Sequence, residues 1–268
     1  ITHVILGAWM TGAFLIISVG SYYLLKNKFQ DFAKRSLKVG ISIALFCVFA
    51  QLLSADHLAK IIAKYNPVKL AAFEGVFKTE EYSKIYTFGW VDAKEEKVYG
   101  LAVPGMLSFL IHGDFKTPVV GLENVPLSER PMVNAVFQMY HIMIIMWGLM
   151  LIAAVIGIWM WRKNSWRLHP RLLKFLVASV LFPQIANMTG WYAAEMGRQP
   201  WTIHKLLRTQ DAYSANVTTA DAALSLGIFV VIYLTFFTLF LILLDRKIKH
   251  GPTDEFEEAP YRDPYKQH

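Results

Sequence analysis

The chain has 268 residues, of which 55% are hydrophobic and 14% aromatic, and it carries a formal net charge of +7. This composition is too apolar for an ordinary soluble domain and predicts a protein with several membrane spans. The basic residues cluster in short segments beside apolar runs, which argues against a protein that binds nucleic acid. The single cysteine, Cys47, excludes a disulfide within the chain.

Five apolar segments are long enough to cross a membrane, because a spanning helix needs about 20 mostly apolar residues. These segments are residues 1–25, 39–62, 132–161, 172–195 and 220–244. We therefore predict an all-α fold, a polytopic membrane helix bundle over residues 1–250 with a polar tail at 251–268. Because the sequence opens directly into a span at Ile1, we interpret it as a fragment or as a chain whose start is missing.

The basic residues predict the direction of the spans. They cluster in three segments, at residues 26–38, 162–174 and 246–249. Five alternating crossings place all three on one side, and short segments rich in Lys and Arg mark the cytoplasmic side. We therefore expect the C-terminal tail to be cytoplasmic and the segments 63–131 and 196–219 to lie outside.

The first span carries a candidate heme ligand near its outer end, His3. Imidazole is a common axial ligand of heme iron, and Gly7 and Gly12 leave room for a flat ring. The same residues also suit an interfacial histidine beside a surface that packs helices. The residues alone leave both interpretations open.

The outer segment 63–131 is long, and a loop of this length is more often functional than idle. Within it, Lys69 and Glu74 place a donor and an acceptor at opposite ends of a short apolar turn. This arrangement suits a quinol, whose ring needs apolar contact and whose hydroxyl needs a proton acceptor. Composition alone favours the simpler interpretation, an exposed lysine and glutamate on a solvated helix.

The third span contains His141 and Met143 among several other methionines. A methionine stripe that fills the core is the simpler interpretation of this pattern. The histidine and Met143 lie two residues apart and point in different directions on a helix. We therefore expect only one of them to reach an iron atom.

The end of the fourth span places three functional groups on one helix face. Glu195 and Arg198 are three residues apart, and Trp191 lies one turn earlier. A carboxylate, a guanidinium and an indole on one face suit a large, planar, anionic ligand such as heme. An interfacial salt bridge in an aromatic belt is the alternative.

The sequence of residues 190–201, G-W-Y-A-A-E-M-G-R-Q-P-W, resembles the G-W-x-x-x-E-x-G-R-Q-P-W signature of subunit I of cytochrome bd quinol oxidases. The resemblance implies that Glu195 is an axial ligand of the high-spin heme b. Arg198 would then pair with a propionate, and Trp191 and Trp201 would form the wall of the site. Charged side chains at membrane depth are costly, and a bound heme would be the partner that explains Glu195 and Arg198 there.

Two further segments carry the same resemblance for the low-spin heme b. The first span resembles the family's H-x-x-x-x-x-x-x-T-G-A segment, which implies that His3 ligates this heme. Met143 matches the second ligand in an F-R-x-M-like element, although His141 replaces the arginine of that element. His141 would replace a propionate contact or compete as the ligand, and we favour Met143.

The outer segment resembles the family's quinol-binding loop. Residues 69–74 match a K-L-A-A-x-E motif, which implies that Lys69 and Glu74 act in quinol oxidation. Residues 117–122 match the end of that loop, and Asp56 is a weaker candidate for the proton path.

The resemblance covers the C-terminal half of subunit I and implies a multi-chain quinol oxidase in a prokaryotic plasma membrane. Electrons would pass from quinol through the low-spin heme b to a high-spin site that reduces oxygen to water. The high-spin site would hold heme b or heme d. The partners would be lipid, a second oxidase subunit and, where it is a separate chain, the N-terminal half of subunit I.

Two other functions remain as alternatives. One is a quinol-oxidising heme b subunit that passes electrons to a different partner and does not reduce oxygen. The other is a transporter or structural membrane protein without a cofactor, which requires four matching motifs to be coincidence. The sequence leaves the identity of the quinone open.

Overall fold

The computed structural model describes residues 1–166, 168–214 and 216–252, and within them five helical segments are long and apolar enough to cross a membrane. They are α1 (Thr2–Leu25), α2 (Gln30–Tyr65), α5 (Val133–Arg162), the consecutive helices α6 (Pro170–Ala178) and α7 (Leu181–Met196), and α8 (Thr219–His250). The predicted helical membrane fold is confirmed. Of the predicted tail at 251–268, residues 253–268 lie outside the described part of the chain.

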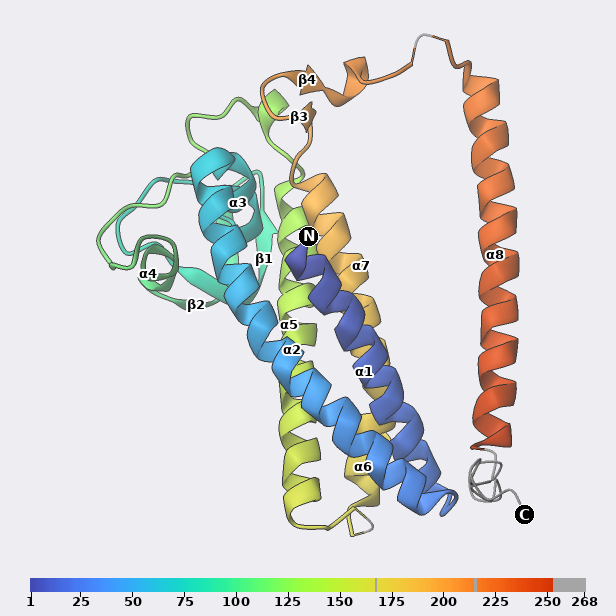
Figure 1. Ribbon diagram of the computed structural model, residues 1–268. Coiled ribbons are helices and arrows are strands. Elements are labelled where there is room, and N and C mark those ends of the chain that lie inside the picture. The colour runs from blue at the N-terminus through green and yellow to red at the C-terminus, as the bar shows by residue number, and fades with distance from the viewer. Residues whose placement is uncertain (167, 215, 253–268) are drawn as a thin grey trace, which may run out of the picture.

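The helices α1, α2, α5, α6 and α7 form one bundle around an apolar core (Figure 1). Its centre contains fully buried side chains from α1, α2 and α5, including Phe14, Ile41 and Met150. Close helix contact depends on small residues: a Cβ added at Gly40 of α2 would lie 3.1 Å from the backbone oxygen of Ala13 in α1. The bundle therefore packs through backbone approach as well as through large side chains.

The fourth predicted span is not continuous, which corrects the predicted helix over 172–195. The chain turns at Ser179 and Val180, between α6 and α7. Pro183 has no backbone N–H to donate to the carbonyl of Ser179, so the helical hydrogen-bond ladder is interrupted there. The Ser179 hydroxyl donates to the backbone oxygen of Leu176 at 2.6 Å and satisfies one group at the break.

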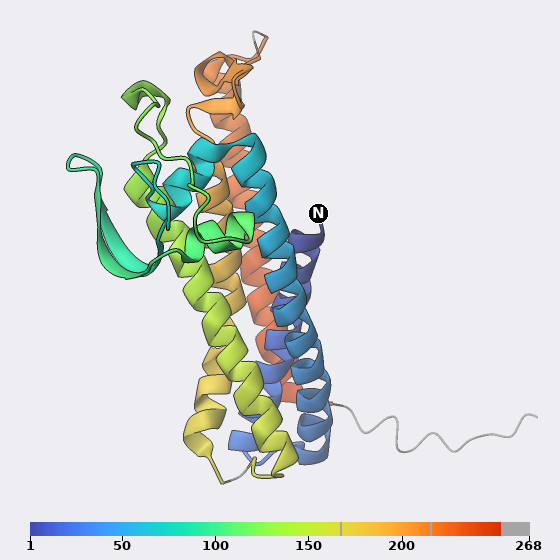
Figure 2. The same cartoon turned by 90° about the vertical axis from the view of Figure 1, so that its left-hand side faces the viewer.

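The outer segment is folded, and it contains structure that the all-α prediction missed. It holds α3 (Pro67–Glu74), β1 (Ile85–Asp92), β2 (Lys97–Val103), α4 (Met106–His112) and the short 3-10 helix η1 (Leu127–Glu129). The strands β1 and β2 form an antiparallel hairpin that lies against the side of α5 (Figure 2). A second small hairpin, β3 (Trp201–Ile203) with β4 (Leu207–Arg208), leads into the 3-10 helix η2 (Thr209–Asp211).

The two ends of the bundle differ as the predicted topology requires. The outer segment and β3–β4 lie at one end, and the connections 26–29 and 163–166 lie at the other end together with the end of α8 (Figure 1). The described residues of the basic segments at 26–38, 162–174 and 246–249 therefore share one end of the molecule. This arrangement agrees with five alternating crossings.

Helix α8 stands apart from the bundle (Figure 1). All of α8 is described, and none of its residues is buried. Its start is fixed by a capping box between Thr218 and Asp221. Its far end touches the bundle where the Tyr23 hydroxyl donates to the backbone oxygen of Ile248 at 2.8 Å.

Candidate functional site

The predicted quinol motif forms the helix α3 and not the short turn that we expected. Asn66 caps the helix by accepting a hydrogen bond from the backbone N–H of Lys69 at 3.1 Å, and Pro67 occupies its first position. Gly75 ends it in the left-handed conformation, with φ of 68°. Lys69 and Glu74 are five residues apart, so their side chains leave the helix about 140° apart and face different neighbours.

Lys69 faces the C-terminal end of α7. Its Nζ donates to the backbone oxygen of Ala194 at 2.9 Å and lies 5.6 Å from the centre of the Phe73 ring. Burial lowers the pKa of the Lys69 ammonium, Glu195 opposes this effect and Arg198 reinforces it. The predicted quinol motif and the predicted heme signature therefore meet at this point.

Gly197 permits this close approach between α3 and the end of α7. A Cβ added there would lie 2.9 Å from Cε1 of Phe73 and 3.3 Å from Cγ of Lys69. Any larger side chain would push α3 away from α7. Gly197 and Phe73 are site residues that the sequence analysis did not single out.

The structure pairs Glu195 with Arg198, as their spacing predicts. The ion pair joins Arg198 Nη2 to Glu195 Oε2, with side chains that are 40% and 37% exposed. Arg198 Nε is buried without a hydrogen-bond partner among the described residues, so one donor remains available to an anionic group. Trp201 lies under the Arg208 guanidinium at 4.9 Å, whereas Trp191 is 63% exposed and does not enclose a site within this chain.

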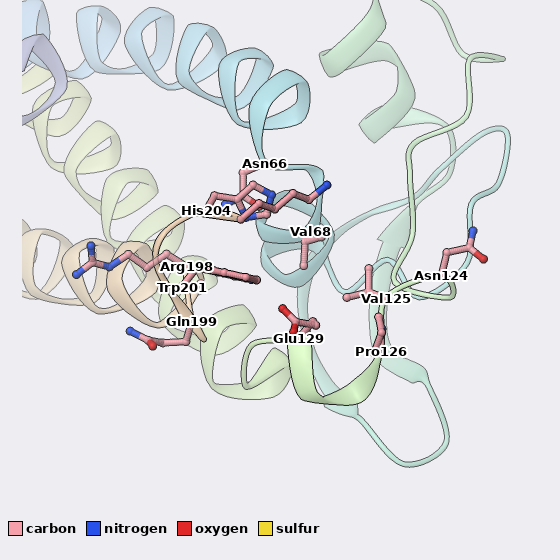
Figure 3. A pocket seen from close by; sticks show the side chains of 12 residues that line it. Asn66, Val68, Asn124, Val125, Pro126, Glu129, Arg198, Gln199, Trp201 and His204 are labelled. Atoms are coloured by element: carbon pink, nitrogen blue, oxygen red, sulfur yellow. The ribbon is translucent and has the colours of Figure 1, made fainter. Parts of the chain in front are cut away.

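A hollow of about 310 Å³ lies beside this junction (Figure 3). Asn66 and Val68 line it from the start of α3, Glu129 from η1, and Trp201 from β3. Figure 3 shows the Arg198 guanidinium directed away from Val68 and Glu129. The hollow therefore offers an apolar and aromatic wall with a few polar groups, the usual character of a small-molecule site.

Glu74 faces α5 and is almost completely buried, with 2% of its surface exposed. The side chain of Tyr140 in α5 lies beside it, and the Tyr140 ring stacks on Phe73 with ring centres 4.7 Å apart. One carboxyl oxygen, Oε2, has no partner among the described residues. Burial raises the pKa of the Glu74 carboxyl to about 7, and the neighbouring Tyr140 partly offsets this rise.

His3 lies in a setting that fits a heme ligand. Its Nε2 is 3.0 Å from Nε2 of Gln51 on α2, and an amide nitrogen can only donate, so the His3 Nε2 carries a lone pair. The other nitrogen, Nδ1, is buried without a partner among the described residues. The Nε2 lone pair accepts from Gln51 in this structure, so His3 would have to exchange that hydrogen bond for the iron in order to act as a neutral imidazole ligand.

Helix α7 contacts both α1, which carries His3, and α5, which carries Met143. Asn187 of α7 donates to Oγ1 of Thr11 in α1 at 3.1 Å. One turn later, a Cβ added at Gly190 would lie 2.6 Å from Sδ of Met143 in α5. The two predicted ligands therefore lie on helices that contact α7 at neighbouring turns.

His141 is held by backbone groups. Its Nδ1 lies 2.8 Å from the backbone oxygen of Phe137, and its Nε2 lies 2.9 Å from the backbone oxygen of Tyr86 in β1. A neutral imidazole has one N–H and donates to only one of these oxygens, but both ring nitrogens face backbone carbonyls, which favours Met143 as the ligand. The assignment of the ligand stays a prediction.

The weaker candidates lie outside these clusters. Asp56 pairs with Lys60 at 2.7 Å on an exposed face of α2. In the segment 117–122, Leu122 is fully buried in the core of the outer segment. Leu122 therefore supports the fold of the outer segment, and no hydrogen bond or ion pair in the described part of the chain joins Asp56 or Leu122 to the side chains of Lys69 or Glu74.

The fold and these charged clusters define a class, a polytopic helical membrane protein with a folded outer segment that contacts the end of a span. The family model described as "Cytochrome bd terminal oxidase subunit I" matches residues 1–252, and the chain belongs to this family. The predicted family is confirmed.

Known proteins show the same relationship. The chain is 32% identical to "Cytochrome bd ubiquinol oxidase subunit 1" of Bacillus subtilis over 99% of its own length and 59% of that protein. It is 25% identical to "Cytochrome bd-II ubiquinol oxidase subunit 1" of Escherichia coli, over 96% and 63%. The solved bd oxidase of Geobacillus thermodenitrificans superposes with a TM-score of 0.80 at 26% identity, over 94% of this chain and 57% of that one. The chain thus spans about three-fifths of the length of these relatives.

Proposed function

We propose that this chain is the heme-bearing C-terminal half of subunit I of a quinol:oxygen oxidoreductase. The observation that carries the proposal is the contact between two motifs far apart in the sequence. Lys69 of the quinol motif donates to Ala194 beside Glu195, and Gly197 of the heme signature packs on Phe73 of the quinol motif. A quinol that reacts at α3 would thus lie next to the residues that hold the electron acceptor.

Lys69 and Glu74 would have different roles in quinol oxidation. The hollow at the start of α3 suits a quinol head group, and Lys69 lies on the α7 side of that helix and would orient a quinol oxygen. Glu74 would accept a proton, because a carboxyl with a pKa of about 7 exchanges protons readily at neutral pH. The burial of Glu74 keeps bulk water from this step.

The heme ligands would be His3 and Met143 for low-spin heme b, and Glu195 for a high-spin heme b or heme d. A bound heme supplies single-electron transfer, and at the high-spin position the reduction of oxygen to water. The Nε2 lone pair of His3 would leave the Gln51 amide to reach the iron, and Met143 offers its thioether sulfur at the surface of α7. Glu195 would leave its ion pair to reach the iron, and Arg198 would turn its donors to a propionate.

The proposal also sets the orientation and the partners. The chain would lie in a prokaryotic plasma membrane with the outer segment outside and the C-terminus in the cytoplasm, because the basic segments share one end. The N-terminal half of subunit I and a second oxidase subunit would complete the complex. The exposed faces of Trp191 and of α8 suit contacts with these partners or with lipid.

Oxygen uptake by the assembled complex, driven by a reduced quinol, tests this function. We expect uptake in membranes that contain the chain and its partners, and loss of uptake when His3 is replaced by Ala. Heme reduction by quinol without any oxygen uptake would instead identify a quinol-oxidising electron-transfer subunit.

A further inference from the structure

The β1–β2 hairpin has an apolar outer face that the described part of the chain leaves uncovered. Side chains alternate between the two faces of a strand, and on the inner face Val91 is buried in the core of the outer segment. The outer face holds two cross-strand pairs, Trp90 opposite Tyr99 and Phe88 opposite Leu101. All four side chains are between 55% and 61% exposed. An antiparallel hairpin with one face in water normally carries polar residues there, so this face departs from the pattern of a solvated sheet.

Hydrogen bonds to α5 fix the depth of the hairpin, which lies against the side of that helix (Figure 2). The backbone N–H of Val91 donates to Oδ1 of Asn134 at 3.3 Å, near the outer end of α5. The backbone oxygen of Tyr86 lies 2.9 Å from Nε2 of His141, about two turns further along α5 and therefore about 10 Å deeper. The open end of the hairpin thus lies deeper than its turn.

The depth at which the hairpin docks is also the depth at which the apolar span of α5 begins. Residues 142–161 contain no charged side chain and are followed by Arg162. A helix of this length spans about 30 Å, the thickness of the hydrocarbon core, so that core begins next to His141. One turn below His141, Ile144 and Ile145 lie on the same side of α5 and are 37% and 42% exposed. The outer face of the hairpin therefore adjoins the exposed apolar surface of the span.

Polarity changes along the hairpin in the same direction as across a membrane surface. The turn and its flanks carry five charged residues, Asp92, Lys94, Glu95, Glu96 and Lys97. The open end instead pairs Ile85 with Val103. Trp90 and Tyr99 lie between these two ends, and Trp and Tyr are the residues enriched at membrane–water interfaces. Lys84, which precedes β1, is exposed, and its long aliphatic stem allows the ammonium group to reach lipid phosphates.

We propose that the outer face of the β1–β2 hairpin lies in the headgroup region of the bilayer and anchors the outer segment to lipid. A bilayer surface offers apolar contact to the aromatic rings and water to the charged turn at the same time. The inner face couples this anchor to α3, because a Cβ added at Gly75, where α3 ends, would lie 2.6 Å from Cγ2 of Val98 in β2. The hairpin thereby sets the height of α3 above the hydrocarbon core. The inference rests on the membrane fold and not on the heme ligands or the role of Lys69.

Spin-label accessibility tests this placement, measured on the assembled complex in nanodiscs of phosphatidylcholine and phosphatidylglycerol. A nitroxide is attached at Leu101→Cys or at Tyr99→Cys, two positions that are more than half exposed, so that little internal packing is lost. Lys94→Cys in the charged turn is the matched control, and the unmodified complex corrects for labelling of Cys47 or of partner chains. Oxygen concentrates in lipid, whereas a polar nickel chelate stays in water. We expect the ratio of oxygen to nickel accessibility to be severalfold higher at Leu101 than at Lys94, with Tyr99 intermediate.

Three results would overturn the inference. High nickel accessibility at Leu101 and Tyr99, equal to that at Lys94, would place the face in water. Low accessibility to both probes would show that a protein partner covers the face. Failure of both cysteine variants to assemble, measured by size-exclusion chromatography, would point to the same protein contact. A complex that shows the expected ratios but lacks quinol-driven oxygen uptake would retain the lipid anchor and contradict only the proposed function.

Discussion

Two carboxylates, Glu74 of α3 and Glu195 of α7, lie in opposite environments. Glu195 is 37% exposed and paired with Arg198, whereas Glu74 is 2% exposed and packed beside Tyr140 of α5. An apolar enclosure favours the neutral form of a carboxyl. We therefore propose different chemistry for the two: Glu195, beside Arg198 at the end of a span, is placed to meet a metal ion, and Glu74 is suited to gain and lose a proton.

The largest effect is expected from Glu195→Gln, which tests the anionic member of this comparison. A neutral amide is a poor ligand for ferric iron, so we expect loss of the high-spin heme signal while the His3–Met143 heme survives. The optical spectrum of the purified complex measures both hemes.

The control for this variant is Glu129→Gln, because Glu129 also pairs with an arginine, Arg208, near the outer surface. That change should preserve both hemes. Exchanging Glu195 and Arg198 distinguishes a ligand from a salt bridge. A normal high-spin signal in the exchanged double variant would show that Glu195 acts only as the partner of Arg198.

The next largest effect concerns the low-spin heme, which should depend on neither Glu74 nor Glu195. In Met143→Leu we expect the low-spin heme signal to disappear or its potential to fall, because the thioether is replaced by an alkyl group. Met146→Leu is the matched control, since Met146 lies one turn further along α5 and also packs on the core. An unchanged spectrum in Met143→Leu, with loss in His141→Ala, would reverse the choice of ligand.

The buried carboxyl of Glu74 should affect how the stability of the protein depends on pH. Burial raises the pKa of Glu74 from 4.5 to about 7, so the folded protein holds this proton more tightly and loses stability as pH rises through that window. Glu74→Gln removes the titration. We expect the variant to gain up to about 3 kcal/mol relative to the unmodified protein at pH 8, compared with pH 5.

Thermal unfolding of the complex at the two pH values measures this gain. Glu123→Gln is the control, because the side-chain hydrogen bond from Thr79 lowers the pKa of that exposed carboxyl and its effect belongs at acid pH. Equal shifts at pH 5 and pH 8 in Glu74→Gln would show that the carboxyl is not protonated in the folded protein.

The smallest effect is expected from Lys69→Ala, which removes the cation that faces the Glu195 side of α3. We expect quinol oxidation to slow by about tenfold with both hemes intact, since one charged hydrogen bond to a substrate oxygen is lost. Lys60→Ala is the control, because Lys60 pairs with Asp56 on an exposed face of α2. Failure of Lys69→Ala to incorporate heme would make this lysine a structural link between α3 and α7.

The spans were predictable because bilayer thickness fixes the length of an apolar helix. The Glu195–Arg198 pair was predictable because residues three apart share a helix face. The break at Ser179 was missed although Pro183 signalled it, and the β1–β2 hairpin was missed although its strands carry aromatic residues such as Trp90.

The environment of Glu74 could not be predicted from the sequence in the same way. Its burial depends on the contact of α3 with Tyr140 of α5, which no local pattern encodes. The pairing of His141 with Tyr86 of β1 depends on the same packing of the outer segment. Local geometry thus explains the exposed carboxylate, and tertiary packing decides the buried one.

The most direct measurement is the quinol-reduced minus oxidised optical spectrum of the purified complex that contains this chain. The account predicts a low-spin heme b band that quinol reduces, together with a high-spin signal that is lost in Glu195→Gln and kept in Glu74→Gln. Absence of any heme b band, or loss of the high-spin signal in Glu74→Gln with retention in Glu195→Gln, would contradict it.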